Sequence, residues 1–236
     1  MDILTILSAN AETPISLSEL AARTGLNKST CAHIVDTLCE AMYVERVSRK
    51  DGYRLGPWSY MLSRYGTYHQ SLIKTSSSVM RWLQEQTGST VFLSVTCNGQ
   101  KYIVYHIDKD NILPMSDGSM IQGCLETTAT GRLMMAYMDT DSLRHSLRMR
   151  NQELEEVVSP ELAAELREIR HRGYAHCSVD VQQTQSFAFR ITEEGKTVAS
   201  VGVLYANAKD SPEFRQQIIK AGKTAAGEIS RRLAFK

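Results

Sequence analysis

The sequence lacks a strong net charge and lacks any long apolar segment. Its 27 Lys and Arg residues nearly balance 26 Asp and Glu residues, which leaves a formal net charge of +1. Any contact with nucleic acid must therefore come from a local patch and not from the field of the whole molecule. No apolar run is long enough to span a bilayer, and Met1 opens into a helical pattern without a charged leader. We expect a cytoplasmic protein that does not contact a membrane.

Cysteine pairs and metal-ligand spacings are missing as well. The five cysteines include neither a Cys-x-x-Cys pair nor the His and Cys spacing of a structural zinc site. The six histidines are also dispersed. The sequence thus predicts reduced thiols, no metal site and no cofactor. The cysteines are Cys31, Cys39, Cys97, Cys124 and Cys177.

Motifs of the common enzyme classes are absent too. The chain has no Gly-x-Ser-x-Gly elbow, no Walker loop, no Gly-x-Gly-x-x-Gly turn and no His-Glu-x-x-His helix. His176 and Cys177 are neighbours in sequence. Adjacent residues of a strand point to opposite faces, however, so these two are not expected to form a nucleophile and base pair. We expect no catalytic residue.

The first 56 residues contain the pattern of a helix-turn-helix. A short first helix stops before Pro14, which cannot continue it. A second begins at Ser16, where the hydroxyl and the Glu19 carboxylate can bond reciprocally to amides of the first turn. Gly25 then suits the left-handed residue that ends this helix.

The third helix has the properties of a recognition helix. Asn27 suits its N-cap, and an apolar stripe follows with helical spacing. The stripe consists of Cys31, Ile34, Val35, Leu38 and Met42. The other face is short and polar, so it can approach base edges in a major groove without obstruction. That face consists of Lys28, Ser29, Ala32, His33, Asp36 and Thr37.

A basic hairpin is predicted directly after this helix. Residues 43–47 and 53–55 have strand patterns and flank a polar turn at 48–52. Capped helices around a glycine turn also occur in all-α domains that never touch DNA, but the hairpin favours a winged helix-turn-helix. We expect base or phosphate contacts from Lys28, Ser29, Thr30 and His33, and backbone contacts from Ser18, Arg46, Arg49, Lys50 and Arg54.

The remainder of the chain predicts a linker helix and an antiparallel sheet. Pro57 suits the start of a helix in which Trp58, Met61, Leu62 and Tyr65 share a face, and Gly66 breaks it. Asn98-Gly99 is a strong hairpin signal between two alternating segments. We expect strands at 90–97, 100–107, 174–179, 187–192 and 197–205, helices at 72–86, 128–138, 161–171 and 213–233, and a long irregular loop at 108–123. Hairpin-linked strands covered by helices indicate an α+β fold.

Ordered segments along nearly the whole chain resemble the IclR (isocitrate lyase regulator) family of bacterial transcription regulators. The matching segments are Leu17-Ser18-Glu19-Leu20-Ala21, Gly25-Leu26-Asn27-Lys28-Ser29-Thr30, Tyr43-Val44-Glu45, Tyr53-Arg54-Leu55-Gly56, Thr128-Ala129-Thr130-Gly131-Arg132 and Arg172-Gly173-Tyr174-Ala175. The resemblance implies a winged helix-turn-helix at 1–56, a linker helix at 57–70 that packs against another subunit, and a GAF-like effector-binding domain at 71–236.

Some positions depart from the family pattern. His33 stands where Arg is frequent, and Met42 stands where Gly is usual between the recognition helix and the wing. In some members a small carboxylate is held by Cys and two Ser residues, which align approximately with Ser186, Gly202 and Leu204. Two of these three positions have no hydroxyl here. A ligand of the glyoxylate or pyruvate type bound in that way does not follow.

The effector is expected in a cup between one sheet face and the long loop, where apolar walls exclude water and a few donors orient the ligand. The N-terminus of the helix after Thr128 offers amides to an anion, although simple capping would explain Thr128 equally well. The predicted effector-binding residues are Thr128, Ala129, Thr130, Gly131, Cys177, Asp180, Ser186 and Gly202.

The sequence therefore predicts a DNA-binding repressor of a catabolic operon, controlled by a small metabolite and acting on double-stranded operator DNA as a homodimer or a dimer of dimers. One alternative is a GAF-type thiol or redox enzyme with an incidental helix-turn-helix, in which Cys124 and Cys177 would react. Another is a protein-interaction module that never contacts DNA.

Overall fold

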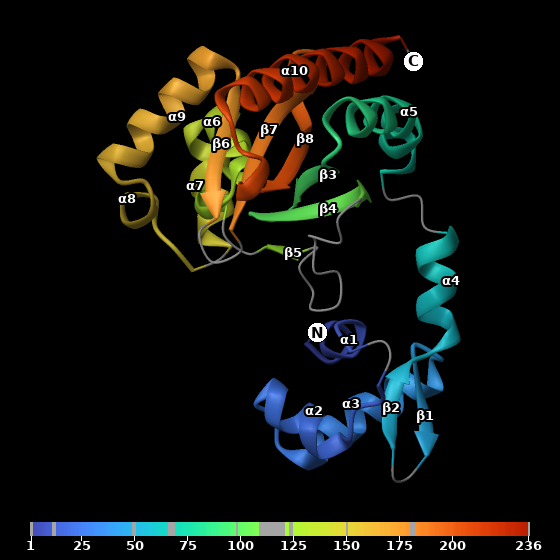
Figure 1. The fold of residues 1–236 in the computed structure, drawn as a ribbon. Coiled ribbons are helices and arrows are strands. Elements are labelled where there is room, and N and C mark those ends of the chain that lie inside the picture. The colour runs from blue at the N-terminus through green and yellow to red at the C-terminus, as the bar shows by residue number, and fades with distance from the viewer. Residues whose placement is uncertain are drawn as a thin grey trace. The chain divides into compact units, whose positions relative to one another are not determined.

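The computed structural model describes residues 2–10, 13–48, 51–65, 69–97, 99–108, 121–122, 125–149, 151–179 and 183–235. These residues form two compact units, one that ends at residue 65 and one that begins at residue 69 (Figure 1). Several predicted positions lie outside the described residues, together with residues 109–120 and 123 of the long loop. They are Arg49, Lys50, Gly66, Asn98, Cys124 and Asp180.

The N-terminal unit is a winged helix-turn-helix, as the sequence predicts. Its elements are α1 (Asp2–Ser8), α2 (Leu17–Thr24), α3 (Lys28–Glu40), β1 (Val44–Ser48), β2 (Gly52–Leu55) and α4 (Pro57–Tyr65). The helices α1, α2 and α3 and the hairpin contribute to one apolar core. Its fully buried members include Leu7, Leu20, Cys31, Val35 and Val44.

The ends of α2 and α3 follow the sequence signals with one exception. The Ser16 hydroxyl accepts from the Glu19 amide at 3.2 Å, and the Asn27 side chain accepts from the Thr30 amide at 2.8 Å. Gly25 has a φ of 70° and ends α2 in the left-handed conformation. The reciprocal capping bond predicted for Glu19 is wrong, because its carboxylate accepts from Arg23 at 2.6 Å instead.

Two members of the predicted α3 stripe are not in the core. Ile34 is 40% exposed and Met42 is 56% exposed, whereas Cys31 and Val35 are fully buried. Ile34 lies at the border between the two faces of α3. Met42 follows the end of the helix and has a φ of 61°, so the chain has already turned away from the helical path.

The junction after α3 is held tightly to the start of α4. The Met42 carbonyl accepts from the Trp58 amide at 3.0 Å, and the Tyr43 carbonyl accepts from the Gly56 amide at 2.7 Å. The Ser59 hydroxyl also donates to the Tyr43 carbonyl at 2.8 Å. A Cβ at Gly56 would lie 2.5 Å from the Met42 oxygen, so only glycine permits this approach.

The C-terminal unit is built on a six-stranded antiparallel sheet with the strand order β5-β4-β3-β8-β7-β6. The strands are β3 (Thr90–Cys97), β4 (Gln100–Ile107), β5 (Ile121–Gln122), β6 (Tyr174–Val179), β7 (Thr184–Glu193) and β8 (Lys196–Ala206). The helices that pack against this sheet include α5 (Gln70–Thr87), α6 (Ala129–Tyr137), α9 (Pro160–Arg172) and α10 (Pro212–Ala234).

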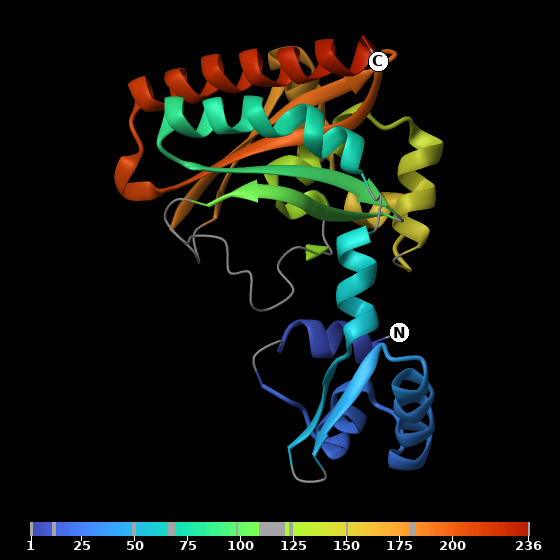
Figure 2. The ribbon, with the colours of Figure 1, turned by 90° about the vertical axis from the view of Figure 1, so that its right-hand side faces the viewer.

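Helices cover both faces of this sheet. The amphipathic helices α5 and α10 lie side by side on one face, where Leu83, Val91, Val201 and Ile229 share the main core (Figure 2). On the other face α6 packs over β6 and β7 and shares a second core with α9. Residues alternate between the two faces along each strand. The second face is the one to which the effector prediction refers.

Strand positions were predicted better than the region between α6 and α9. The predicted strands at 90–97, 100–107 and 174–179 are confirmed without change. The sequence analysis made no prediction for α7 (Thr140–Arg148) or α8 (Leu154–Val157), and β5 lies within the expected irregular loop. Asp139 caps α7 by accepting from the Ser142 amide at 2.8 Å. None of the described helices combines the length and apolar character needed to cross a membrane.

The left-handed conformation of Met42 leads to a stability prediction. Met42→Gly should raise the free energy of unfolding by about 1 kcal/mol, because glycine adopts this φ without a steric penalty. The exposed Met42 side chain contributes little burial that would be lost. Chemical denaturation measures the change. Met42→Ala is the matched control, since it shortens the side chain and keeps the strain. An equal gain from alanine would contradict the explanation.

Candidate DNA-binding surface and effector-binding face

The polar side of α3 is open to solvent. Lys28, Ser29, Thr30 and His33 are all exposed, and so is Ser18 in the first turn of α2. The opposite side of α3 is closed by the core of the N-terminal unit. Short polar side chains on an exposed helix face are what a major groove requires. Ile34 adds an exposed apolar side chain at the edge of this face, which the sequence analysis assigned to the core.

The two described arginines of the wing, Arg46 and Arg54, differ in their interaction partners. Arg46 is exposed, and its guanidinium carbon lies 5.6 Å from the centre of the Tyr53 ring. Arg54 pairs with Glu45, its Cα partner on β1. A paired guanidinium contributes less net positive charge than a solitary one. The positive patch is therefore weaker at Arg54 than the sequence suggests.

The first turn of α6 is closed by its own residues. The Thr128 hydroxyl accepts from the Gly131 amide at 3.1 Å, so this amide already has a partner. Ala129, Thr130 and Gly131 are buried, and a Cβ at Gly131 would collide with the Leu125 carbonyl. Arg132 fixes the same turn by donating to the Glu126 carbonyl at 2.6 Å and to Glu165 at 2.7 Å. Capping and close packing account for Thr128 and Gly131 in this structure.

Cys177 and Ser186 lie together on the sheet as Cα partners of β6 and β7. Cys177 is 7% exposed in the core under α6, and this burial raises the pKa of its thiol. A buried thiol with a raised pKa has little thiolate at neutral pH. His176 points to the opposite face, where it bonds to Gln185 at 2.6 Å. The two residues are therefore separate, as predicted.

Gly202 makes room for an aromatic side chain. The Phe92 ring lies so close over Gly202 that a Cβ there would collide with it. Phe92, Ile103 and Leu204 form a small buried cluster on the same sheet face. Gly202, one of the three positions at which some family members hold a carboxylate, is thus covered by the Phe92 side chain.

Three polar residues on this face were missed by the sequence analysis. Ser94 and Ser200 are Cα partners on β3 and β8 and are fully buried. Lys101 on β4 is 2% exposed, and burial lowers the pKa of its ammonium group to about 8. Lysines are rarely this buried. The signal in the sequence is a lysine at an inward position of a strand, two residues before Ile103.

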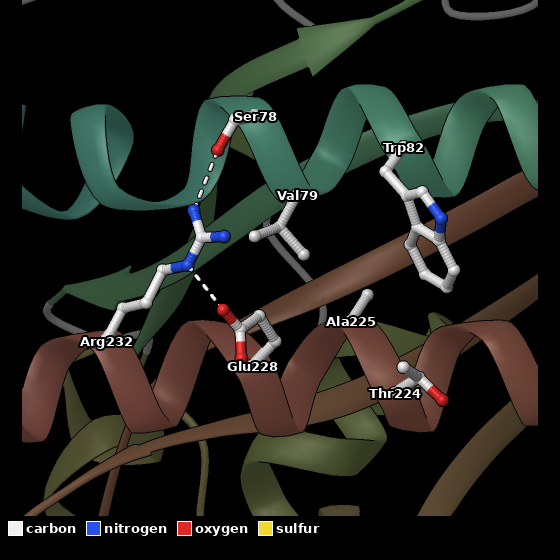
Figure 3. Close-up of a pocket in the computed structure, with 7 residues that line it drawn as sticks. All are labelled: Ser78, Val79, Trp82, Thr224, Ala225, Glu228 and Arg232. Atoms are coloured by element: carbon white, nitrogen blue, oxygen red, sulfur yellow. Dashed lines mark hydrogen bonds and ion pairs between the residues drawn. The ribbon is translucent and has the colours of Figure 1, made fainter.

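A separate hollow of about 390 Å³ lies between α5 and α10, on the other face of the sheet. Its charged lining residues neutralise each other, because Arg232 donates to Glu228 at 2.6 Å and to Ser78 at 2.8 Å (Figure 3). Trp82 borders the hollow and is 37% exposed. No group of His, Cys, Asp and Glu suited to a metal ion occurs among the residues that the structure describes.

Comparison with known families gives the assignment. Residues 1–48 match the IclR helix-turn-helix domain, and residues 66–231 match the C-terminal domain of the bacterial transcriptional regulator IclR. The chain belongs to the IclR family. The predicted family and fold are therefore confirmed. IclR-family proteins are transcription regulators with a DNA-binding helix-turn-helix and not enzymes, so the alternative of a thiol or redox enzyme is wrong.

Relatives and solved structures agree with this assignment. The chain is 23% identical to the regulator KdgR of Escherichia coli K12, with 100% of this chain and 92% of KdgR covered. It is 28% identical to the glycerol operon regulatory protein of Streptomyces coelicolor, with coverages of 96% and 92%. An IclR regulator structure from Alicyclobacillus acidocaldarius has a TM-score of 0.77 at 22% identity, covering 98% of this chain and 96% of its own. An IclR homologue from Microbacterium hydrocarbonoxydans, solved with 4-hydroxybenzoate, has a TM-score of 0.76 at 17% identity, with coverages of 99% and 98%.

The Glu45–Arg54 pair leads to a prediction for the wing. Glu45→Gln should strengthen binding to a mixed-sequence duplex and steepen its salt dependence, because Arg54 becomes free to neutralise a phosphate. Fluorescence anisotropy at several salt concentrations measures both. The control for removing one negative charge is Glu85→Gln, since Glu85 is exposed on the outer side of α5. If the two variants gained affinity equally, the effect would come from net charge and not from Arg54.

Proposed function

We propose that this IclR-family regulator is a repressor that binds operator DNA as a homodimer or a pair of homodimers and responds to a small metabolite. The observation that carries the DNA half of the proposal is the geometry of α3. Its apolar side is sealed in the core by Cys31 and Val35, while Lys28 and His33 stay exposed on the other side. A helix presented in this way fits the major groove.

The contacts with DNA divide into two sets. Lys28, Ser29, Thr30 and His33 approach base edges or the adjacent phosphates from α3. Ser18, Arg46, Arg49, Lys50 and Arg54 are proposed to contact the backbone on either side. Backbone contacts fix the register of the helix, and the base contacts select the sequence. Because Glu45 pairs with Arg54, Arg46 is proposed to be the stronger anchor of the two.

The linker helix α4 supports the dimer. Trp58, Tyr60 and Leu62 are 48%, 62% and 51% exposed, so α4 carries three large apolar side chains outside the core of its own unit. Trp58 and Leu62 are four residues apart and share one face of α4, so packing that face against the α4 of a second copy would remove both side chains from water. A dimer places two recognition helices on successive half-sites of a near-palindromic operator.

The effector half rests on the domain organisation, which we propose as a winged helix-turn-helix at 1–56, a linker at 57–70 and an effector-binding domain at 71–236. The neighbour solved with 4-hydroxybenzoate supports a small organic ligand for a fold of this kind. An effector changes operator occupancy only if it binds one arrangement of the dimer better than another. The relatives named for a glycerol operon and as a transcriptional repressor support repression of a catabolic operon.

The DNA half is tested by removing charge from α3. Lys28→Ala should weaken binding to the protein's own promoter region and lower the salt slope by about one, because one phosphate contact disappears. The control is Lys74→Ala, which removes an exposed lysine from α5. Cys177→Ser should leave DNA binding nearly intact. If Lys28→Ala bound with wild-type affinity and slope, α3 would not be the recognition helix.

The linker is tested by placing a charge on its apolar surface. Leu62→Asp should convert the dimer to a monomer and reduce operator affinity, because a carboxylate is costly to bury in the proposed interface. Analytical ultracentrifugation measures the mass of the particle. Met149→Asp is the control, since Met149 is 54% exposed in the other unit. A dimer of unchanged stability in Leu62→Asp would exclude α4 as the interface.

A further inference from the structure

We propose that Ile34 on α3 contacts the 5-methyl group of a thymine in each half-site of the operator and is a specificity-determining residue of this regulator. The inference rests on the proposed function, because it requires α3 to lie in the major groove. Of the four bases, thymine presents a methyl group there, and an apolar side chain recognises it by contact and not by a hydrogen bond. Uracil differs from thymine only by lacking this methyl group.

The place of Ile34 on the outside of α3 is fixed by its neighbours in the core. Cys31 and Val35 are fully buried, whereas Ile34 is 40% exposed. Successive residues of a helix are separated by about 100° around the axis. A rotation of α3 that buried Ile34 would therefore move Val35 toward solvent. The core of the N-terminal unit thus holds Ile34 at the edge of the exposed face of α3.

Two threonines lie next to Ile34 on this edge. Thr30 precedes Ile34 by four residues and Thr37 follows it by three, and both threonines are exposed. Side chains at these spacings are neighbours on a helix surface. The Thr37 hydroxyl donates to the His33 carbonyl at 2.9 Å, so its hydrogen is already used within the helix. Thr37 therefore has its methyl group to offer to a base, and Ile34 is the largest apolar side chain of this edge.

The charges of α3 favour this edge over the opposite one. Asp36 and Glu40 are exposed, and helical spacing places both on the far side of His33 from Ile34. A duplex carries a high density of negative charge, so an orientation that turns these carboxylates toward the phosphates is unfavourable. The favoured orientation brings the edge with Ile34 to the bases.

This contact selects a base, whereas the proposed contacts of the wing do not. Arg46 and Arg54 are proposed to contact the DNA backbone, which is the same in every sequence. The Ile34 contact is lost when thymine is replaced by a base without a methyl group. A dimer has two copies of α3, so one such thymine is expected in each half-site.

The test begins with duplexes that the full-length protein selects from a random pool. The wild type should enrich a thymine at one fixed position of each half-site. A synthetic duplex of the enriched sequence, with deoxyuridine in place of this one thymine per half-site, should bind about tenfold more weakly in fluorescence anisotropy. The reason is that one buried methyl group is lost from each of two half-sites. The hydrogen-bonding groups of the two duplexes are identical, so the ratio of affinities reports the methyl contact.

Variants of the protein assign the contact to Ile34. Ile34→Ala should bind the thymine and uracil duplexes with less than a twofold difference. Ile34→Val should keep most of the discrimination, since valine retains both branches at Cβ. The matched control is Val47→Ala, because Val47 is an apolar side chain that is 42% exposed on the wing. This control should keep the wild-type ratio even if its affinity changes. Circular dichroism shows whether each variant is folded.

Three results would overturn the inference. They are equal affinity of the wild type for the two duplexes, an unchanged ratio in Ile34→Ala, and enriched half-sites without a fixed thymine. If Ile34→Ala does not fold, Ile34→Gln takes its place, because glutamine keeps the volume of the side chain and favours a helix. If the wild type enriches no sequence at all, the proposed operator binding is contradicted. Enriched half-sites with no difference between thymine and uracil contradict only this inference.

Discussion

The burial of one side of α3 is the constraint on which the DNA-binding half depends. Cys31 and Val35 are fully enclosed by side chains from α1, α2 and β1, which fixes the rotation of α3 about its own axis. Once this rotation is fixed, Lys28 and His33 must lie on the outside. The same core receives Tyr53 from the wing, so the hairpin is positioned by apolar contacts and not by the charges that it carries.

The sheet of the C-terminal unit separates two kinds of interior. The face under α5 and α10 is a continuous apolar core that includes Val91, Leu93, Val201 and Val203. The other face mixes apolar and polar side chains, because Ser94, Ser200 and Lys101 alternate with those core residues along the same strands. The first face therefore carries the larger apolar core, and the second face carries a smaller one around α6 and α9.

Much of this architecture could be predicted because its signals are local. Ser159 and Ser211 each precede a proline and cap α9 and α10, and the alternating strands from residue 90 to 107 are confirmed. The errors concern features that depend on tertiary contacts. Ile34 fits the helical period but lies at the edge of its core, and the Glu45–Arg54 pair depends on hairpin register. A lysine in a strand is expected at the surface, and the burial of Lys101 depends on residues that are distant in the sequence.

The bonds between the α3–β1 junction and α4 have a mechanical consequence. Hydrogen bonds to the carbonyls of Met42 and Tyr43 fasten the first turn of α4 to the chain that leaves α3. The backbone of Gly56 lies so close to the Met42 oxygen that no other side chain fits at this position. The helices α3 and α4 are therefore joined by a short junction that several hydrogen bonds hold together. In the proposed dimer, a tilt of one α4 relative to the other would therefore change the distance between the two α3 helices.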